Sequence, residues 1–281
     1  MNKLTKRVKS LAQRFVGRLG YEIRPKSESM EPVPRPCAVD IAIASLSTRG
    51  KLSFVQVGAN DGKLEDPIYQ HVLAHGSKVM LIEPQPWLIE ALTENYKTFT
   101  GALMIENIAI GPEDGTLALH ILKKEFWAEY SARDGRSPTI LFSPDRNLLR
   151  RRIARRMAVD VAEAEKRLDV IEVPMQPLSD VMARHGFDDV DLLQIDCEGY
   201  DIQVILSLGG YRPALINFES FSLSETDKKL FMEWCKEKGY GFVQGSKDTL
   251  AIRGFGDQFY IGSNPFNPAL SSDEKLPALG S

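Results

Sequence analysis

Short apolar runs recur along most of this chain and are separated by stretches with the polar and apolar spacing of helices. The runs that predict β-strands lie at residues 55–57, 79–82, 103–106, 190–196 and 214–218. Their short length and nearly continuous apolar character are typical of strands buried on both faces. Because strands that alternate with helices favour a parallel sheet covered by helices, the pattern predicts an α/β fold.

Local signals place further elements around the first strands. Asp66 and Pro67 predict the N-cap and first residue of a short helix, and Gly76 predicts its end. A turn after the third strand leads into an extended run at residues 116–122. We expect this run to pair back on residues 103–106.

Toward the carboxyl end, Ser224 predicts the N-cap of a helix over residues 225–238. Two extended runs follow, residues 240–244 and 249–253, with a short polar turn between them. This order of signals predicts a β-hairpin at the end of the sheet.

Residues 123–169 interrupt the alternation and predict an insertion in the main domain, which we place at residues 37–263. A helix in this insertion carries a dense run of arginines: Arg150, Arg151, Arg152, Arg155 and Arg156. Two interpretations stay open, a lid or substrate wall and a solvated basic helix. If the arginines act on a substrate, they favour an anionic one, such as a phosphorylated or acidic saccharide.

The two ends of the chain differ from the main domain. Residues 1–36 predict a basic amphipathic helix over residues 1–20, followed by a Pro-rich linker. Such a helix could make a peripheral membrane contact, or it could pack on a partner or on the domain itself. Residues 264–281 are rich in Pro, Ser and Gly, which predicts a disordered tail.

Composition narrows the classes of function. The net charge of −3 argues against bulk attraction to nucleic acid, so no nucleic-acid partner is expected. Cys37, Cys197 and Cys235 are far apart and form neither a zinc pattern nor a disulfide framework. No apolar run approaches the roughly 20 residues of a membrane span. We therefore expect a cytoplasmic protein, with peripheral membrane association left open by its first helix.

The first candidate site follows the strand at residues 55–57. Gly58, Asn60 and Gly62 punctuate the loop, and these are residues that adopt left-handed backbone conformations at low cost. Glu83 ends the next strand, about 20 to 25 residues beyond the loop, where dinucleotide folds place a ribose-binding carboxylate. The pair predicts a site for a nucleotide-bearing ligand.

Three acids follow the later strands. Asp196 and Glu219 end successive strands, and Glu198 lies two residues after the first of them. Because ligands of α/β proteins bind at the carboxyl ends of strands, we expect these carboxylates to meet at the crevice and to be catalytic. One could act as a general base, or together they could hold Mg²⁺. A capping role at the next helix is the alternative for Glu198.

Four segments together resemble the FkbM-type family of S-adenosylmethionine-dependent methyltransferases. They are residues 57–62 (VGANDG), 81–84 (LIEP), 107–111 (NIAIG) and 193–201 (LQIDCEGYD). The resemblance covers roughly residues 52–253. It implies a Rossmann-like class I methyltransferase fold, with a mostly parallel seven-stranded sheet and helices on both faces.

The resemblance also implies roles for individual residues. Gly58, Asn60, Asp61 and Gly62 would hold the methionine portion of S-adenosylmethionine, and Glu83 the ribose hydroxyls. Asn107 with Ile108 would contact the adenine. Gln56 departs from the family pattern, which often has an acid there, but its amide can still accept a hydrogen bond from the cofactor's ammonium.

The expected activity is methylation of a hydroxyl on a glycan, a glycolipid or a secondary metabolite. An NAD-dependent oxidoreductase would use the same loop and Glu83, but the loop lacks the full GxGxxG spacing. Nucleic-acid methylation could use the arginine run, although no Asn-Pro-Pro-aromatic element follows the fourth strand. A non-catalytic cofactor-binding scaffold is a further alternative.

Overall fold

The computed structural model describes residues 37–221, 223–245 and 247–254. The predicted amphipathic helix with its membrane contact, the linker and the tail all lie outside these residues. Among the residues described, no helix is both long enough and apolar enough to cross a membrane.

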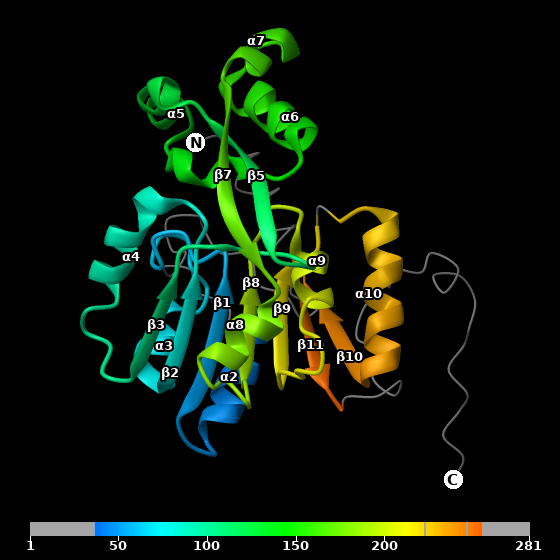
Figure 1. Cartoon of the computed structure of the whole chain (residues 1–281). Helices are drawn as coiled ribbons and strands as arrows, with labels where there is room; N and C mark the ends of the chain where they lie inside the picture. Colours follow the sequence, from blue (N-terminus) through cyan, green and yellow to red (C-terminus); the bar gives the residue numbers. More distant parts are fainter. Residues whose placement is uncertain (1–36, 222, 246, 255–281) are drawn as a thin grey trace, which may run out of the picture. The chain divides into compact units, whose positions relative to one another are not determined.

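A seven-stranded sheet forms the centre of the domain, in the order β10-β11-β9-β8-β1-β2-β3 (Figure 1). Its strands are β1 Leu52–Val57, β2 Gly76–Ile82, β3 Ala102–Glu106, β8 Leu192–Ile195, β9 Leu215–Glu219, β10 Tyr240–Gln244 and β11 Asp248–Arg253. The pairs from β3 through β9 are parallel. β11 runs antiparallel to both β9 and β10, so the expectation of a mostly parallel sheet is only partly correct. The predicted terminal hairpin is confirmed by β10 and β11.

Helices cover both faces of this sheet. On one face α2 Ala38–Ser47, α3 Tyr69–His75 and α4 Ile89–Asn95 contribute to a single apolar core. On the other face α8 Leu178–Arg184, α9 Asp201–Leu206 and α10 Glu225–Lys238 form a second core. Successive side chains of β1 point to opposite faces of the sheet: Phe54 packs in the first core and Val55 packs in the second. Burial on both faces explains the continuous apolar runs of the central strands.

The helix termini follow the capping signals in one case and depart from them in another. Ser224 caps α10 as predicted, since its hydroxyl accepts a hydrogen bond from the Asp227 amide. The predicted N-cap at Asp66 is wrong, because α3 begins at Tyr69 with Ile68 at the N-cap. Asp66 still accepts hydrogen bonds from the amides of Ile68 and Tyr69 through Oδ1, so it stabilises the turn before the helix.

A second sheet of four strands follows β3, in the order β4-β7-β5-β6. Its strands are β4 Ala109–Ile110, β5 Gly115–Leu122, β6 Phe142–Ser143 and β7 Leu168–Gln176. The expected pairing of residues 116–122 with residues 103–106 is wrong, because β5 pairs along its whole length with β7 and near its end with β6. β5 and β7 form a long antiparallel pair that extends away from the main sheet (Figure 1).

A small helical lobe connects the far ends of β5 and β7 (Figure 1). It contains α5 Trp127–Asp134, α6 Arg146–Met157 and α7 Val161–Lys166, and short 3-10 turns at Lys124–Phe126 and Pro138–Ile140. A further 3-10 turn, Pro86–Leu88, precedes α4 in the main domain. Leu149, Ile153 and Met157 form the buried side of α6 and pack against Tyr130 of α5 in a separate apolar core. The arginine run therefore lies on a helix that packs in the core of the lobe and not in the cores of the main sheet.

Candidate functional site

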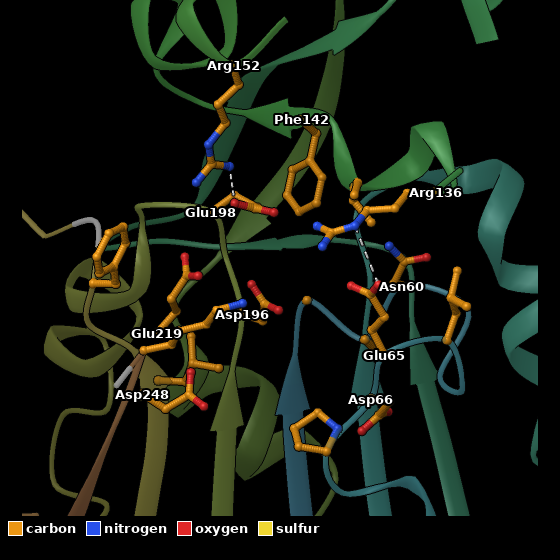
Figure 2. A pocket seen from close by; sticks show the side chains of 18 of the residues that line it. Asn60, Glu65, Asp66, Arg136, Phe142, Arg152, Asp196, Glu198, Glu219 and Asp248 are labelled. Carbon is orange, nitrogen blue, oxygen red and sulfur yellow. Dashed lines mark hydrogen bonds and ion pairs between the residues drawn. The ribbon is translucent and has the colours of Figure 1, made fainter. Parts of the chain in front are cut away.

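A pocket with a volume of about 950 Å³ opens at the carboxyl ends of β1, β8 and β9. In the sheet, β1 lies between β2 and β8: β2 and β3 follow on one side of it, and β8 and the later strands lie on the other. The order of strands therefore changes direction at β1, and open α/β sheets bind their ligands at such a switch point. The lobe supplies the opposite wall, including Arg136, Phe142 and Arg152 (Figure 2).

The loop after β1 packs tightly against the end of β8. The amides of Gly58 and Ala59 both donate to the carbonyl of Ile82. Gly58 has a φ of +81°, and a Cβ at this position would lie 2.0 Å from the backbone oxygen of Asp196. Asn60 is also left-handed, with a φ of 50°. The local backbone therefore requires the residue types seen in the sequence.

Glu83 lies beneath this loop and is fully buried. Its carboxylate accepts hydrogen bonds from the amides of Asn60, at 2.8 Å, and Gln85, at 2.9 Å. Burial raises the pKa of Glu83 to about 7, against the lowering effect of these two amides. Asn107 donates through Nδ2 to the backbone oxygen of Glu83. The structure thus brings Asn60, Glu83 and Asn107 together.

The lobe covers this group. The Thr139 hydroxyl donates to the side-chain oxygen of Asn60, and Nε2 of the Gln85 side chain donates to the Thr139 backbone oxygen. Gly58 and Asn60 line the open pocket, whereas the other predicted cofactor residues do not: Asp61, Gly62, Glu83, Asn107 and Ile108. Asp61 shapes the loop instead, since Oδ1 accepts from the amides of Lys63 and Leu64.

The three predicted catalytic acids all line the pocket, together with Asp248, which the sequence analysis missed (Figure 2). Asp248 at the start of β11 is the register partner of Glu219 at the end of β9. Asp196 is exposed to the pocket. The protein atoms around the pocket displace part of the water near its carboxyl group, and this desolvation, together with the neighbouring carboxylates, first among them Glu198, raises the pKa of Asp196 well above its usual range.

Glu198 does not cap α9. Its backbone has a φ of 52°, and its carboxylate forms an ion pair with Arg152 of α6 (Figure 2). Burial raises the pKa of Glu198, and Arg152 opposes this shift. Asp201 holds the loop below by accepting hydrogen bonds from the amides of Cys197 and Gly199. The lobe and the strand-end loop are therefore linked through one charged contact.

Gln56 and Asp66 form a polar pair on the pocket wall. Gln56 Nε2 donates to Asp66 Oδ2 at 3.0 Å. Burial raises the pKa of Asp66 to about 6, although its three hydrogen bonds lower it. Gln56 Oε1 is buried without a hydrogen-bond partner among the residues described. A buried acceptor without a donor is costly, so this oxygen marks a place for a ligand's donor group.

Among residues 37–254, apart from the undescribed positions 222 and 246, no group of three or more Asp, Glu, His or Cys side chains is arranged to hold a metal ion. Proteins usually hold Mg²⁺ through one or two carboxylates and several water molecules. The expected Mg²⁺ therefore stays a prediction.

The seven-stranded sheet with its reversed strand β11, and the glycine loop at its switch point, define a class I methyltransferase fold. The sequence profile of the Methyltransferase FkbM domain matches residues 56–244. The chain belongs to the FkbM methyltransferase family. This membership favours a methyltransferase over an NAD-dependent oxidoreductase.

Solved structures with similar folds include several methyltransferases. Methyltransferase FkbM from Methylobacillus flagellatus KT is 11% identical, with a TM-score of 0.44; the match covers 72% of this chain and 43% of that one, less than half its length. Precorrin-6y C5,15-methyltransferase from Geobacter metallireducens GS-15 is 10% identical over 82% of this chain and 96% of that one, with a TM-score of 0.36. TrmK from M. capricolum, solved with S-adenosyl-homocysteine, is 8% identical over 75% of this chain and 65% of that one, with a TM-score of 0.34. No curated protein matches the sequence significantly.

Proposed function

We propose that this protein transfers a methyl group from S-adenosylmethionine to a hydroxyl group of a glycan, a glycolipid or a secondary metabolite. The observation that carries the proposal is the contact between Gly58 and the backbone of Asp196. It brings the cofactor loop against the strand end that bears a carboxylate of raised pKa. A cofactor-binding loop and a proton acceptor thus share one pocket wall.

The residues present fit this cofactor. Its ammonium group is a donor for the unpartnered Oε1 of Gln56. Glu83 and Asn107 lie behind the loop and outside the open pocket, where Glu83 holds the amide of Asn60; their contacts with the ribose and the adenine rest on the family resemblance alone. Acidic and basic side chains both line the pocket, and the acidic ones, among them Asp196 and Glu219, favour positive charge near them. When bound, S-adenosylmethionine supplies an electrophilic methyl group on a sulfonium.

Asp196 is the general base in this proposal. A carboxylate with a raised pKa has a stronger affinity for a proton, which suits it to accept one from a hydroxyl. As the hydroxyl oxygen forms its bond to the methyl carbon, the carbon–sulfur bond breaks and the hydroxyl proton passes to Asp196. Glu219 and Asp248 beside it offer acceptors for neighbouring hydroxyls of the acceptor molecule.

The test begins with calorimetric titration of S-adenosylmethionine, S-adenosylhomocysteine and NAD into the purified protein. Binding of the first two without NAD supports the proposal. Binding of NAD alone would contradict the proposal and favour an NAD-dependent oxidoreductase. Binding of S-adenosylmethionine with no methylated product from an acceptor screen would favour the non-catalytic scaffold.

An acceptor screen with isotopically labelled S-adenosylmethionine then identifies the product, and the Asp196→Asn variant tests the base. We expect turnover to fall by roughly a hundredfold or more, with the Kd of S-adenosylhomocysteine unchanged. Asp188→Asn is the matched control, since Asp188 is exposed in the loop before β8. Full turnover by Asp196→Asn would remove Asp196 from the mechanism, and a methyl group on nitrogen or carbon in the product would contradict O-methylation.

A further inference from the structure

Helix α6 has one buried face and one face toward the pocket. Leu149, Ile153 and Met157 recur at the spacing of one helix face and are buried in the core of the lobe. The pocket is lined from the other side of the helix by Leu148 and by four arginines, Arg151, Arg152, Arg155 and Arg156. The basic run is therefore not simply a solvated helix face.

Two of these arginines are occupied by the protein itself. Arg152 pairs with Glu198. Arg156 pairs with Asp134 at 2.9 Å and also donates to the hydroxyl of Tyr130. Both guanidinium groups therefore hold the lobe together or fix it to the strand ends, and they are not available as binding groups without a loss of structure.

Arg151 and Arg155 are different. Both are exposed and line the pocket, and neither makes an ion pair or hydrogen bond with any residue in the part of the chain that the structure describes. They are four residues apart in α6, so their side chains lie on the same side of the helix. Two guanidinium groups so placed can bind a carboxylate or phosphate through several charge-assisted hydrogen bonds.

We propose that Arg151 and Arg155 form a subsite for an anionic group, a carboxylate or a phosphate, on the acceptor. This inference rests on the proposed methyl transfer, because it places the anion in the same pocket as Asp196. It goes further by defining the acceptor as an acidic saccharide or a sugar phosphate and by assigning the residues that select it.

The opposite wall of the pocket gives the acceptor an orientation. Asp196, Glu219 and Asp248 line the side formed by the strand ends (Figure 2). Lys247 lines the same side of the pocket, but the three carboxylates outnumber it, so this side repels an anion and accepts hydrogen bonds from hydroxyls. An acidic sugar therefore directs its charge toward α6 and its hydroxyls toward Asp196, as methyl transfer requires.

An aromatic side chain supports a sugar ring in this arrangement. Phe221 follows β9, lines the pocket and is 77% exposed. A large apolar side chain exposed at the edge of a binding pocket is a contact surface for the apolar face of a ligand. Its position on the acid side of the pocket suits a ring whose hydroxyls reach Glu219 and Asp248.

The experiment uses the full chain saturated with S-adenosylhomocysteine and three calorimetric probes. Methyl glucuronide carries a carboxylate, glucose 1-phosphate carries a phosphate, and methyl glucoside is neutral. We expect at least one anionic probe to bind about tenfold more tightly than the neutral one, and the two anionic probes distinguish a carboxylate site from a phosphate site. Arg151→Gln/Arg155→Gln should abolish this preference.

Arg133→Gln/Arg146→Gln is the matched control, because it removes the same charge from exposed positions that do not line the pocket. It should retain the preference for the anionic probe. Equal binding of charged and neutral probes, no binding of any probe, or a preference that survives Arg151→Gln/Arg155→Gln would overturn the subsite. Salt-sensitive binding of a single-stranded RNA that both double variants weaken equally would also overturn it, in favour of a general basic surface. Failure of S-adenosylhomocysteine to bind would instead count against the proposed function.

Discussion

Gly58 and Asp196 are in contact across the pocket wall: a Cβ on Gly58 would lie 2.0 Å from the Asp196 backbone oxygen. Two segments far apart in the sequence are thereby fixed against each other, the loop after β1 and the end of β8. The amide of Asp196 adds to this by donating to the carbonyl of Val57. The position of the proposed base relative to the cofactor loop is thus determined by backbone packing.

The first prediction concerns this contact. Gly58→Ala should destabilise the protein by more than about 2 kcal/mol, because alanine disfavours the positive φ and its methyl group collides with rigid backbone. Urea unfolding measures the change, and calorimetry should show weakened binding of S-adenosylhomocysteine. Gly115→Ala is the control, since Gly115 has open space around it and should tolerate the change. A stable Gly58→Ala variant with normal binding would mean that the loop and β8 can separate.

The second prediction concerns Gln56. Gln56→Ala should weaken S-adenosylhomocysteine binding about tenfold, because Oε1 is the proposed acceptor for the ammonium group. Adenosine lacks that group, so its binding should change much less. Calorimetric titration of both ligands into the wild type and the variant separates the effects. An equal loss for both ligands would show that Gln56 acts by supporting Asp66 and the loop.

The third prediction follows from the raised pKa of buried Glu83. In the folded protein its pKa is about 7, whereas the ordinary pKa of a glutamate is 4.5. The folded state therefore holds the proton more tightly than the unfolded state. This contribution to stability is fully present below about pH 4.5 and is lost as the pH rises to about 7. A shift of this size corresponds to about 3 kcal/mol.

Urea unfolding of wild type and Glu83→Gln between pH 5 and 8 measures this effect. The wild type should lose stability relative to the variant as the pH rises. Glu90→Gln serves as control, because Glu90 is exposed and its curve should run parallel to that of the wild type. The opposite slope for Glu83 would mean that the two amides from Asn60 and Gln85 outweigh burial.

The elements predictable from sequence are those with local signals. The strands beside β1 are buried on both faces and appear as continuous apolar runs, and Ser224 marks the start of α10 by its own hydrogen bond. Strand β7 gives no such signal, since most of its positions are partly or fully exposed and Pro174 interrupts it. Its pairing with β5 depends on contacts across the whole lobe, which no local pattern contains.

In the candidate site, too, residues with a local sequence signal were predictable and residues placed by tertiary contacts were not. Asp196 and Glu219 were predictable because Asp196 directly follows one apolar strand and Glu219 ends the next, and parallel strand ends meet at one edge. Asp248 begins a strand and reaches the pocket only because β11 is antiparallel to β9. Asp66 resembled a helix cap, and one of its oxygens does bind two amides; the contact of the other with Gln56 is tertiary.

The fourth prediction concerns the ion pair between Arg152 and Glu198, which joins the lobe to the strand ends. The side chains are only 15% and 19% exposed, so removing either partner leaves a poorly solvated charge on the other. A double-mutant cycle with Arg152→Gln and Glu198→Gln should give a coupling energy of about 1–3 kcal/mol in urea unfolding. Lys97 and Glu94 form the matched exposed pair, each 64% exposed, and should give less than about 0.5 kcal/mol. A cycle for Arg152 and Glu198 as weak as that of the surface pair would show that other contacts, such as those of Thr139 with Asn60 and Gln85, hold the lobe over the pocket.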